Sequence, residues 1–351
     1  MQLKKLISFL ETVAPPRYQE SYDNAQLITG NPEMEIEGVL VCLDSTEAVL
    51  EEAITKNCNV VVAHHPIVFT GLKSLTGKNY VERVVIKAIQ NNIAIYAIHT
   101  NLDNMYLQGV NTKIAEKLDL TRTRVLSPRS GLKKLNAYTA SSDAPALRSA
   151  LLDAGAGNVG MFQQLSYFSQ GTGNQNQKMD EEVKIEMLFQ PDRERSILTA
   201  LKLQKTSRAT PFEITSVDNA NMMVGSGMIG QLKEPMAEMP FLRKVAEVMN
   251  APCIRHTQIR RKMIQTVAVC GGAGSFLLPR AIVQKADIFI TADFKYHEFF
   301  DADRKIIIAD IGHYESEQYT IELLFDIISQ NFSNFAAYST KVDTNPVRYL
   351  C

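Results

Sequence analysis

The stretch GVLVCLDSTEAVLEEAITKNCNVVVAHHP, residues 38–66, decides the fold. Its two apolar runs, 38–44 and 60–63, are typical of strands buried on both faces. Residues 45–57 between them have the spacing of an amphipathic helix, with Ser45 or Thr46 as its N-cap. A strand, a helix and a second strand in this order predict a parallel βαβ unit.

The same order of elements occurs twice in the chain. In the first half the βαβ unit is followed by a helix at 80–92 and a strand at 93–103. In the second half the corresponding segments are a strand at 266–272, a mostly helical stretch at 273–286, a strand at 287–293 and a strand beginning at 305. Each half ends in a histidine followed four residues later by a carboxylate, His99 with Asp103 and His313 with Glu317. We interpret this pattern as an internal duplication of an α/β layer.

A different pattern separates the two halves. Residues 131–220 contain the order strand, helix, strand, strand, helix, strand, with a polar hairpin or loose loop at 171–182. This βαββαβ order is that of a ferredoxin-like unit. The expected fold class is therefore α/β, with two similar halves, 1–130 and 221–351, forming a core domain that an inserted ferredoxin-like α+β domain interrupts.

The bulk composition argues against several classes of partner. Of the 351 residues 45% are hydrophobic and 21% charged, and the net charge of −1 gives no global attraction to nucleic acid or membrane. The densest basic group (Arg255, Arg260, Arg261 and Lys262) is interpreted as solvated surface. The N-terminal segment lacks the features of a signal peptide, and no apolar run has transmembrane length. Five scattered cysteines without C-x-x-C spacing predict reduced thiols in a cytoplasmic protein.

Histidines cluster at the predicted strand ends. Five of the six, His64, His65, His99, His297 and His313, lie at or just beyond the end of a predicted strand, where open α/β sheets bind ligands. The sixth, His256, is interpreted as an ordinary surface or strand histidine. Adjacent residues on a continuing strand would point to opposite faces. If the strand instead stops at Ala63 and Pro66 bends the chain, both rings of the His64–His65 pair can converge on one site.

Carboxylates accompany these imidazoles. His313 and Glu317 are four residues apart at the start of a predicted helix and so share a face, although such pairs are common on surfaces. Asp103 follows a strand in HTNLDN, where an Asx turn is the alternative interpretation. Imidazoles and carboxylates together favour borderline divalent ions such as Zn²⁺, Fe²⁺ and Mn²⁺. A carboxylate can also bridge two such ions.

These motifs resemble the Ngg-interacting-factor-like proteins, also called GTP cyclohydrolase 1 type 2 homologues. The resemblance covers both halves, through ESYDNAQLITG, VVVAHHPIVFTGLKSL, IHTNLDN, CGGAGSFLLPRA, ITADFKYHEF and IADIGHYESE. It implies a centre of two divalent metal ions (Zn, Fe or Mn) held by His64, His65, Asp103, His313 and a bridging Glu317. It further implies a toroidal homohexamer and an insert similar to nitrogen-regulatory PII-like proteins. YDNAQL departs from the family's tryptophan-DN-x-GL, a difference that touches the loop and not the ligands.

Further residues are expected to act around these ligands. His99 is expected to contact one of the metal ligands and orient it, without binding a metal itself. His297 and Asp293 are the catalytic candidates: His297 as a proton shuttle or substrate contact, with a purely structural role as the alternative, and Asp293 as a group that holds His297 or a metal-bound water. The loop CGGAGS could hold an anion such as phosphate through its backbone N–H groups, or serve tight helix–strand packing. Lys295 is a second candidate for phosphate recognition.

Two classes of function fit this sequence. The first is a metal-dependent hydrolase in which activated water attacks a nucleotide or related substrate, such as C8 of GTP, or a phosphoester or amide. The second is a non-catalytic, metal-binding hexamer that acts as a scaffold, metal carrier or regulatory partner.

Overall fold

The computed structural model of the protein describes residues 1–160, 162–175, 178–207 and 209–350. The chain divides into two compact units, Met1–Ser127 with Gly225–Cys351, and Pro128–Val224. The sequence predicted the inserted segment at 131–220. Among the described residues no helix is both long and apolar enough to cross a membrane.

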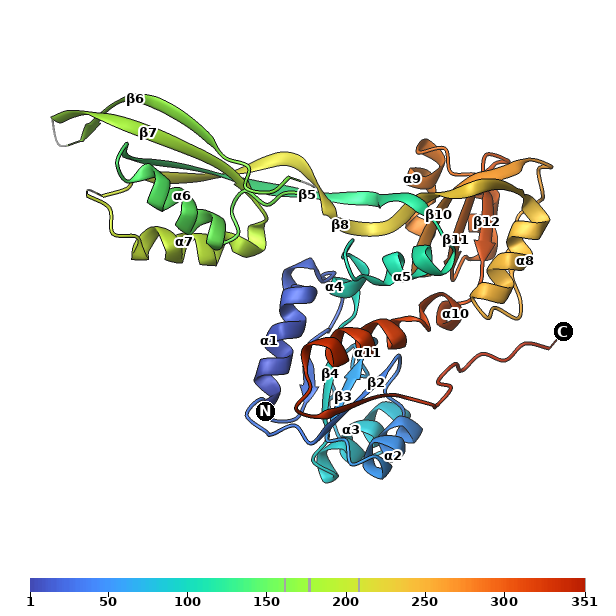
Figure 1. Ribbon diagram of the computed structural model, residues 1–351. Coiled ribbons are helices and arrows are strands. Elements are labelled where there is room, and N and C mark those ends of the chain that lie inside the picture. Colours follow the sequence, from blue (N-terminus) through green and yellow to red (C-terminus); the bar gives the residue numbers. More distant parts are fainter. Residues whose placement is uncertain (161, 176–177, 208, 351) are drawn as a thin grey trace. The chain divides into compact units, whose positions relative to one another are not determined.

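The first unit contains a five-stranded sheet in the order β1-β4-β3-β2-β13 (Figure 1). Its strands are β1 (Leu27–Thr29), β2 (Gly38–Cys42), β3 (Val60–Ala63), β4 (Ala94–Ala97) and β13 (Ala336–Ser339). β13, β2, β3 and β4 run parallel, whereas β1 is antiparallel. Helices α2 (Glu47–Thr55) and α3 (Tyr80–Gln90) connect the central strands, and the hydroxyl of Thr46 caps α2 by accepting the N–H of Val49. The predicted βαβ units are confirmed.

Both faces of this sheet are covered, which explains the continuous apolar runs. Leu40 and Val61 pack with residues of α2 and α3 on one face. Val41 and Val62, their neighbours in the strands, point to the other face and pack with residues of α1 (Leu3–Val13) and α11 (Thr320–Asn331). The alternation of strand side chains thus divides one apolar run between two layers of core.

The second sheet of this unit has the order β8-β10-β11-β12-β9. Its strands are β8 (Phe212–Ala237), β9 (Arg255–His256), β10 (Met263–Ala273), β11 (Ile288–Ala292) and β12 (Ile307–Asp310). The three strands β10, β11 and β12 are parallel and lie in sequence order, as β2, β3 and β4 do. Its helices are α5 (Val110–Lys117), α8 (Glu238–Val248), α9 (Leu278–Val283) and the 3-10 helices η3 (Ser275–Leu277) and η4 (Tyr296–Ala302). The two similar α/β halves are therefore confirmed.

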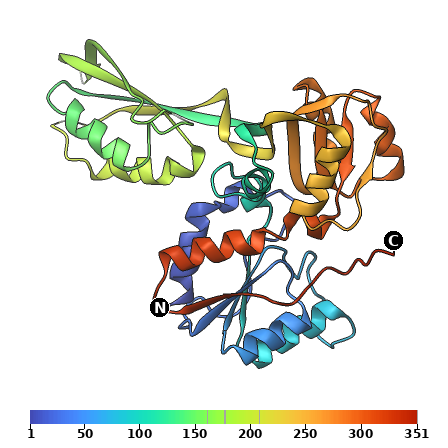
Figure 2. The same ribbon diagram turned by 45° about the vertical axis from the view of Figure 1, so that its right-hand side comes forward.

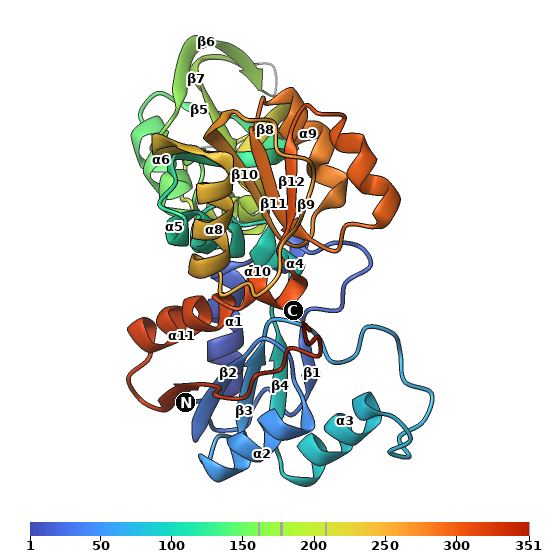
Figure 3. The same ribbon diagram turned by 90° about the vertical axis from the view of Figure 1, so that its right-hand side faces the viewer.

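Short helices begin where the central strands of the two sheets end. α4 (Thr100–Asp103) begins shortly after β4, and α10 (His313–Glu317) shortly after β12. Both lie between the two sheets in Figure 3. One hydrophobic core, which includes Val41 of β2 and Val269 of β10, packs against both sheets. Residues that follow strands of either half are thereby brought to one place.

The second unit has the predicted βαββαβ order. Its elements are β5 (Thr121–Ala140), α6 (Ala144–Asp153), β6 (Tyr167–Gln175), β7 (Lys178–Phe189), α7 (Glu194–Leu203) and the start of β8. The strand order β6-β7-β5-β8 is that of a ferredoxin-like sheet, and both helices cover one face (Figure 2). In the polar segment the described residues 171–175 and 178–182 pair as far as Gln175 opposite Lys178, which is the pairing of a hairpin and not of a loose loop.

Candidate metal centre

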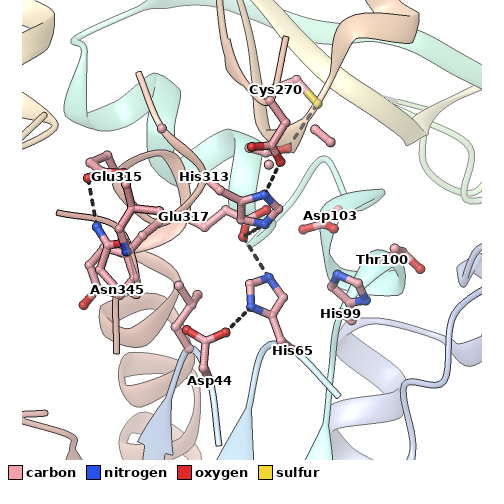
Figure 4. Close-up of a pocket in the computed structure, with 18 of the residues that line it drawn as sticks. Asp44, His65, His99, Thr100, Asp103, Cys270, His313, Glu315, Glu317 and Asn345 are labelled. Atoms are coloured by element: carbon pink, nitrogen blue, oxygen red, sulfur yellow. Dashed lines mark hydrogen bonds and ion pairs between the residues drawn. The ribbon is translucent and has the colours of Figure 1, made fainter. Parts of the chain in front are cut away.

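A cavity of about 830 Å³ lies in the first unit beyond the carboxyl ends of the parallel strands. It is lined by His65, His99, Asp103, His313 and Glu317, which converge in Figure 4, while His64 is fully buried beside them. Residues from both halves of the core therefore form one cluster.

Glu317 lies at the centre of this cluster. Its Oε2 atom is 3.0 Å from Nε2 of His65 and 3.1 Å from Nε2 of His313. Helix α10 places His313 and Glu317 one turn apart on the same face. The other carboxylate oxygen, Oε1, lies against Gly272, where an added Cβ would be only 2.5 Å away and where φ is +62°. Glycine is thus required there on two grounds, close approach and left-handed backbone.

His64 and Asp103 form a second contact with an unusual feature. The Nδ1 atom of His64 lies 2.9 Å from the carbonyl of Ile98, which can only accept, so Nδ1 carries the proton and Nε2 has a free lone pair. That Nε2 is 3.5 Å from Oδ1 of Asp103, and both atoms are buried without a hydrogen-bond partner. Burial lowers the pKa of His64 to about 3, which keeps the ring neutral. Burial and the charge of Glu317 raise the pKa of Asp103. A cation between the two acceptors would satisfy both.

Carboxylates orient the other two imidazoles that contact Glu317. The Nδ1 atom of His65 is 2.7 Å from Asp44, and that of His313 is 2.6 Å from Asp293. Burial alone would lower both imidazole pKa values, but the hydrogen bonds and charges of the carboxylates raise the pKa of His65 to about 10 and that of His313 to about 11. Each ring therefore directs Nε2 at Glu317, as carboxylate–histidine pairs do at metal sites.

His99 lies closer to the cluster than the sequence indicated. Its ring centroid is 5.3 Å from that of His64 and 5.2 Å from that of His65, and it lines the cavity directly. Asp23, 2.8 Å from its Nδ1 atom, orients it. Burial opposes ionisation of Asp23, but hydrogen bonds from His99 and Thr100 lower its pKa to about 2. Sequence reasoning missed Asp23 and Asp44, although Asp44 ends the apolar run 38–44 and Asp23 lies in the ESYDNAQL motif.

Three overlapping groups in the described part of the chain could each hold a metal ion. They are His64 with Asp103 and Glu317, His65 with His313 and Glu317, and His64 with His65 and His99. Within each group the ligand atoms lie within 4.8 Å of one another. The first two groups share Glu317 and divide the adjacent histidines between them.

The structure does not bring His297 to this cluster. Its side chain is exposed on η4, 5.2 Å between ring centroids from Tyr296, and does not line the cavity. Asp293 does line it, but its bond is to His313 and not to His297. The hydrogen bond from His313 lowers the pKa of Asp293. The geometry gives Asp293 an orienting role and leaves a catalytic role of His297 without support.

The loop CGGAGS is used for packing inside the protein. The N–H of Gly271 donates to Asn111 and that of Gly272 to Ser316, at 3.0 and 2.9 Å. Lys295 is exposed and lies outside the cavity lining. Of the two alternatives for this loop, the structure supports helix–strand packing, because two of its N–H groups are already bonded.

A sequence profile of the Duf34/NIF3 (NGG1p interacting factor 3) family matches residues 1–346. The chain belongs to this family. Two similar proteins are named GTP cyclohydrolase 1 type 2 homolog. The one from Staphylococcus epidermidis is 29% identical over 369 residues, covering 99% of this chain and 100% of the relative. The one from Bacillus subtilis is 29% identical over 367 residues, covering 99% and 98%.

The fold of the Duf34/NIF3 family extends over the whole chain. The crystal structure of a Bacillus cereus protein related to NIF3 matches with a TM-score of 0.87 and 30% identity, covering 100% of this chain and 99% of that one. A Staphylococcus aureus structure matches with a TM-score of 0.82 and 27% identity, with the same coverage. The family that the motifs predicted is therefore confirmed.

Proposed function

We propose that this chain is a hydrolase that depends on two divalent cations. His64 and Asp103 would hold one cation, His65 and His313 the other, and Glu317 would bridge them. The observation that carries the proposal is the buried, unpartnered pair of acceptors on His64 and Asp103, facing a carboxylate that already contacts the other two ligands. Leaving such buried polar atoms unsatisfied is costly, and a cation removes that cost.

The spacing of the candidate ligands suits metal binding. Two ligands at about 2.1 Å from a tetrahedral ion are about 3.4 Å apart. The distances between neighbouring ligand atoms of the cluster are 3.0, 3.1, 3.5 and 3.9 Å. Imidazole and carboxylate together suit Zn²⁺, Fe²⁺ or Mn²⁺. When bound, such ions supply Lewis acidity and make water a stronger nucleophile at neutral pH.

The residues around the ligands would hold the ligand imidazoles in place and transfer protons. Asp44 and Asp293 fix the rings of His65 and His313, and the carbonyl of Ile98 fixes His64. His99, whose Nδ1 is held by Asp23, would accept or donate a proton at Nε2 beside the cluster. The name of the relatives points to a nucleotide or a related compound as substrate. The hexameric toroid and a PII-like role of the insert stay predictions from the family resemblance.

The test combines metal loading with a matched variant. The purified chain is loaded with Zn²⁺, Fe²⁺ or Mn²⁺ and assayed with nucleosides, nucleotides, phosphoesters and amides. We expect turnover that Glu317→Gln abolishes while the circular dichroism spectrum is unchanged, and that exposed Glu37→Gln leaves intact. Equal turnover in the Glu317 variant would refute the proposal. Metal binding without turnover in any form would favour the non-catalytic, regulatory alternative.

A further inference from the structure

The wall of the metal-site cavity is strongly acidic. Beyond Asp103 and Glu317, five further carboxylates line it, Glu20, Asp44, Asp293, Asp310 and Glu315. Among the described lining residues these are opposed by a single arginine and no lysine. That arginine, Arg255, is committed to an ion pair with Asp310 and to the carbonyl of Phe294 at 3.1 Å. The cavity thus offers an incoming phosphate group no uncommitted cationic side chain.

Bound cations would not reverse this balance. Seven carboxylates and one guanidinium leave six negative charges when the imidazoles are neutral ligands. Two divalent cations contribute four positive charges, so the lining keeps a net negative charge. Hydrogen bonds hold several carboxylates in place: Glu315 accepts from Asn345 at 2.9 Å, and Glu20 from Asn104 at 3.0 Å. The negative charge is therefore a built feature of the wall and not a set of mobile side chains.

Aromatic side chains make up much of the remaining wall. Tyr22, Phe69, Tyr80 and Phe276 line the cavity, and each is more than half exposed. The ring of Phe69 lies 6.0 Å between centroids from that of His99, at the metal-site end of the cavity. Accessible aromatic faces beside carboxylates suit a planar ring that is neutral or positively charged, because both stacking and cation–π contacts favour it.

No phosphate cradle compensates elsewhere in the described lining. The N–H groups of Gly271 and Gly272, the strongest candidates from the sequence, donate to Asn111 and Ser316. A polyphosphate in this cavity would face like charges without donors aimed at it, and such an arrangement selects against anionic ligands.

We propose that the cavity takes a planar, non-anionic heterocycle and discriminates against the same ring when it carries phosphate groups. The inference rests on the proposed metal centre, since the cavity presents its ligand to that cluster. It narrows the substrate class: the recognised part is the ring, and a nucleoside triphosphate is a poorer ligand than its nucleoside.

The test is equilibrium binding, so it does not depend on turnover. Metal-loaded, full-length protein is titrated calorimetrically with guanosine, its 5′-monophosphate and its 5′-triphosphate. We expect the affinity to fall with each added phosphate, by about ten-fold or more from guanosine to the triphosphate. The difference in affinity between guanosine and its triphosphate should be smaller at high salt, where screening weakens like-charge repulsion. Equal or tighter binding of the triphosphate, or no measurable binding of guanosine, would overturn the inference.

A pair of variants tests the cause. The double variant Glu20→Gln, Glu315→Gln removes two negative charges of the cavity wall that do not belong to the candidate ligands. It should reduce the difference in binding affinity between guanosine and its triphosphate. Glu37→Gln, an exposed residue outside the cavity, should leave this difference unchanged. If the order of affinities holds but no metal form hydrolyses any substrate, the proposed function fails and this inference stands. If hydrolysis occurs but the triphosphate binds best, this inference fails and the proposed function stands.

Discussion

His64 and Asp103 face each other across 3.5 Å with two buried acceptor atoms that no hydrogen bond satisfies. In the metal-free protein this contact is unfavourable, because each atom has lost water and gained nothing. The contact therefore opposes stability unless a cation lies between the two atoms. This conflict between local stability and ligand geometry is typical of functional sites.

The effect of Asp103→Asn on stability should change sign when metal is bound. Without metal we expect the variant to have a free energy of unfolding about 1–3 kcal/mol larger than that of wild type, and so to unfold at higher urea concentration, since an amide can donate to Nε2 of His64 and removes a buried carboxylate. With metal the order should invert, because a ligand is lost. Urea denaturation with and without chelator measures both. A variant less stable than wild type in chelator would contradict this reading of the contact.

Metal binding should release protons. In the metal-free protein the pKa of His65 is raised to about 10 and that of His313 to about 11, so both rings are protonated at pH 7. A metal ligand must give up its proton, so filling the centre should release about two protons from these rings at pH 7. Metal affinity should therefore rise with pH until about pH 11, most steeply below pH 10. Calorimetry in buffers of different ionisation enthalpy counts the protons. An apparent enthalpy independent of the buffer would refute this.

Thr344 should tune metal affinity from the C-terminal segment. Its hydroxyl donates to Asp44 at 2.7 Å, and Asp44 in turn holds His65 at 2.7 Å. Thr344→Val should weaken metal binding by about ten-fold, at the lower end of losses seen when outer partners of ligands are removed. Thr344→Ser keeps the hydroxyl and should restore wild-type affinity. If both variants bind metal alike, the link through Asp44 is not functional.

Gly272→Ala should disturb Glu317 directly. The new Cβ would lie 2.5 Å from Oε1 of Glu317, at a φ of +62° that alanine adopts with strain. We expect loss of metal binding and destabilisation of about 1 kcal/mol or more from the backbone alone. Gly71→Ala is a suitable control, because its Cβ would meet no atom within 4 Å. Wild-type metal content in the Gly272 variant would show that Glu317 can move without cost.

The sequence predicted those parts of the site that depend on local pattern. Apolar runs set the strands, and the strand ends locate His64, His65 and Asp103. Helical spacing alone places His313 and Glu317 on one face. Only the family resemblance joined the two sets of residues into one site, because the strand ends of two separate sheets need not lie at one place.

Contacts between residues that are far apart in the sequence could not be predicted from local patterns. Thr344 reaches Asp44 across 300 residues, and no local spacing indicates that contact. His297 follows a strand end as His64 does, but it lies on η4 and is exposed. The number of residues between a strand end and a side chain does not determine in which direction the connecting loop runs. The glycine loop resembled an anion site because its N–H partners, Asn111 and Ser316, lie on other elements.

The most direct test of the dinuclear centre is an anomalous difference map from a crystal of the protein grown with Zn²⁺ or Mn²⁺. We predict two peaks on either side of the Glu317 carboxylate, one about 2.0–2.2 Å from His64 and Asp103, the other at similar distances from His65 and His313. A single peak, or peaks that leave His64 and His65 facing separate pockets without an ion, would contradict the account.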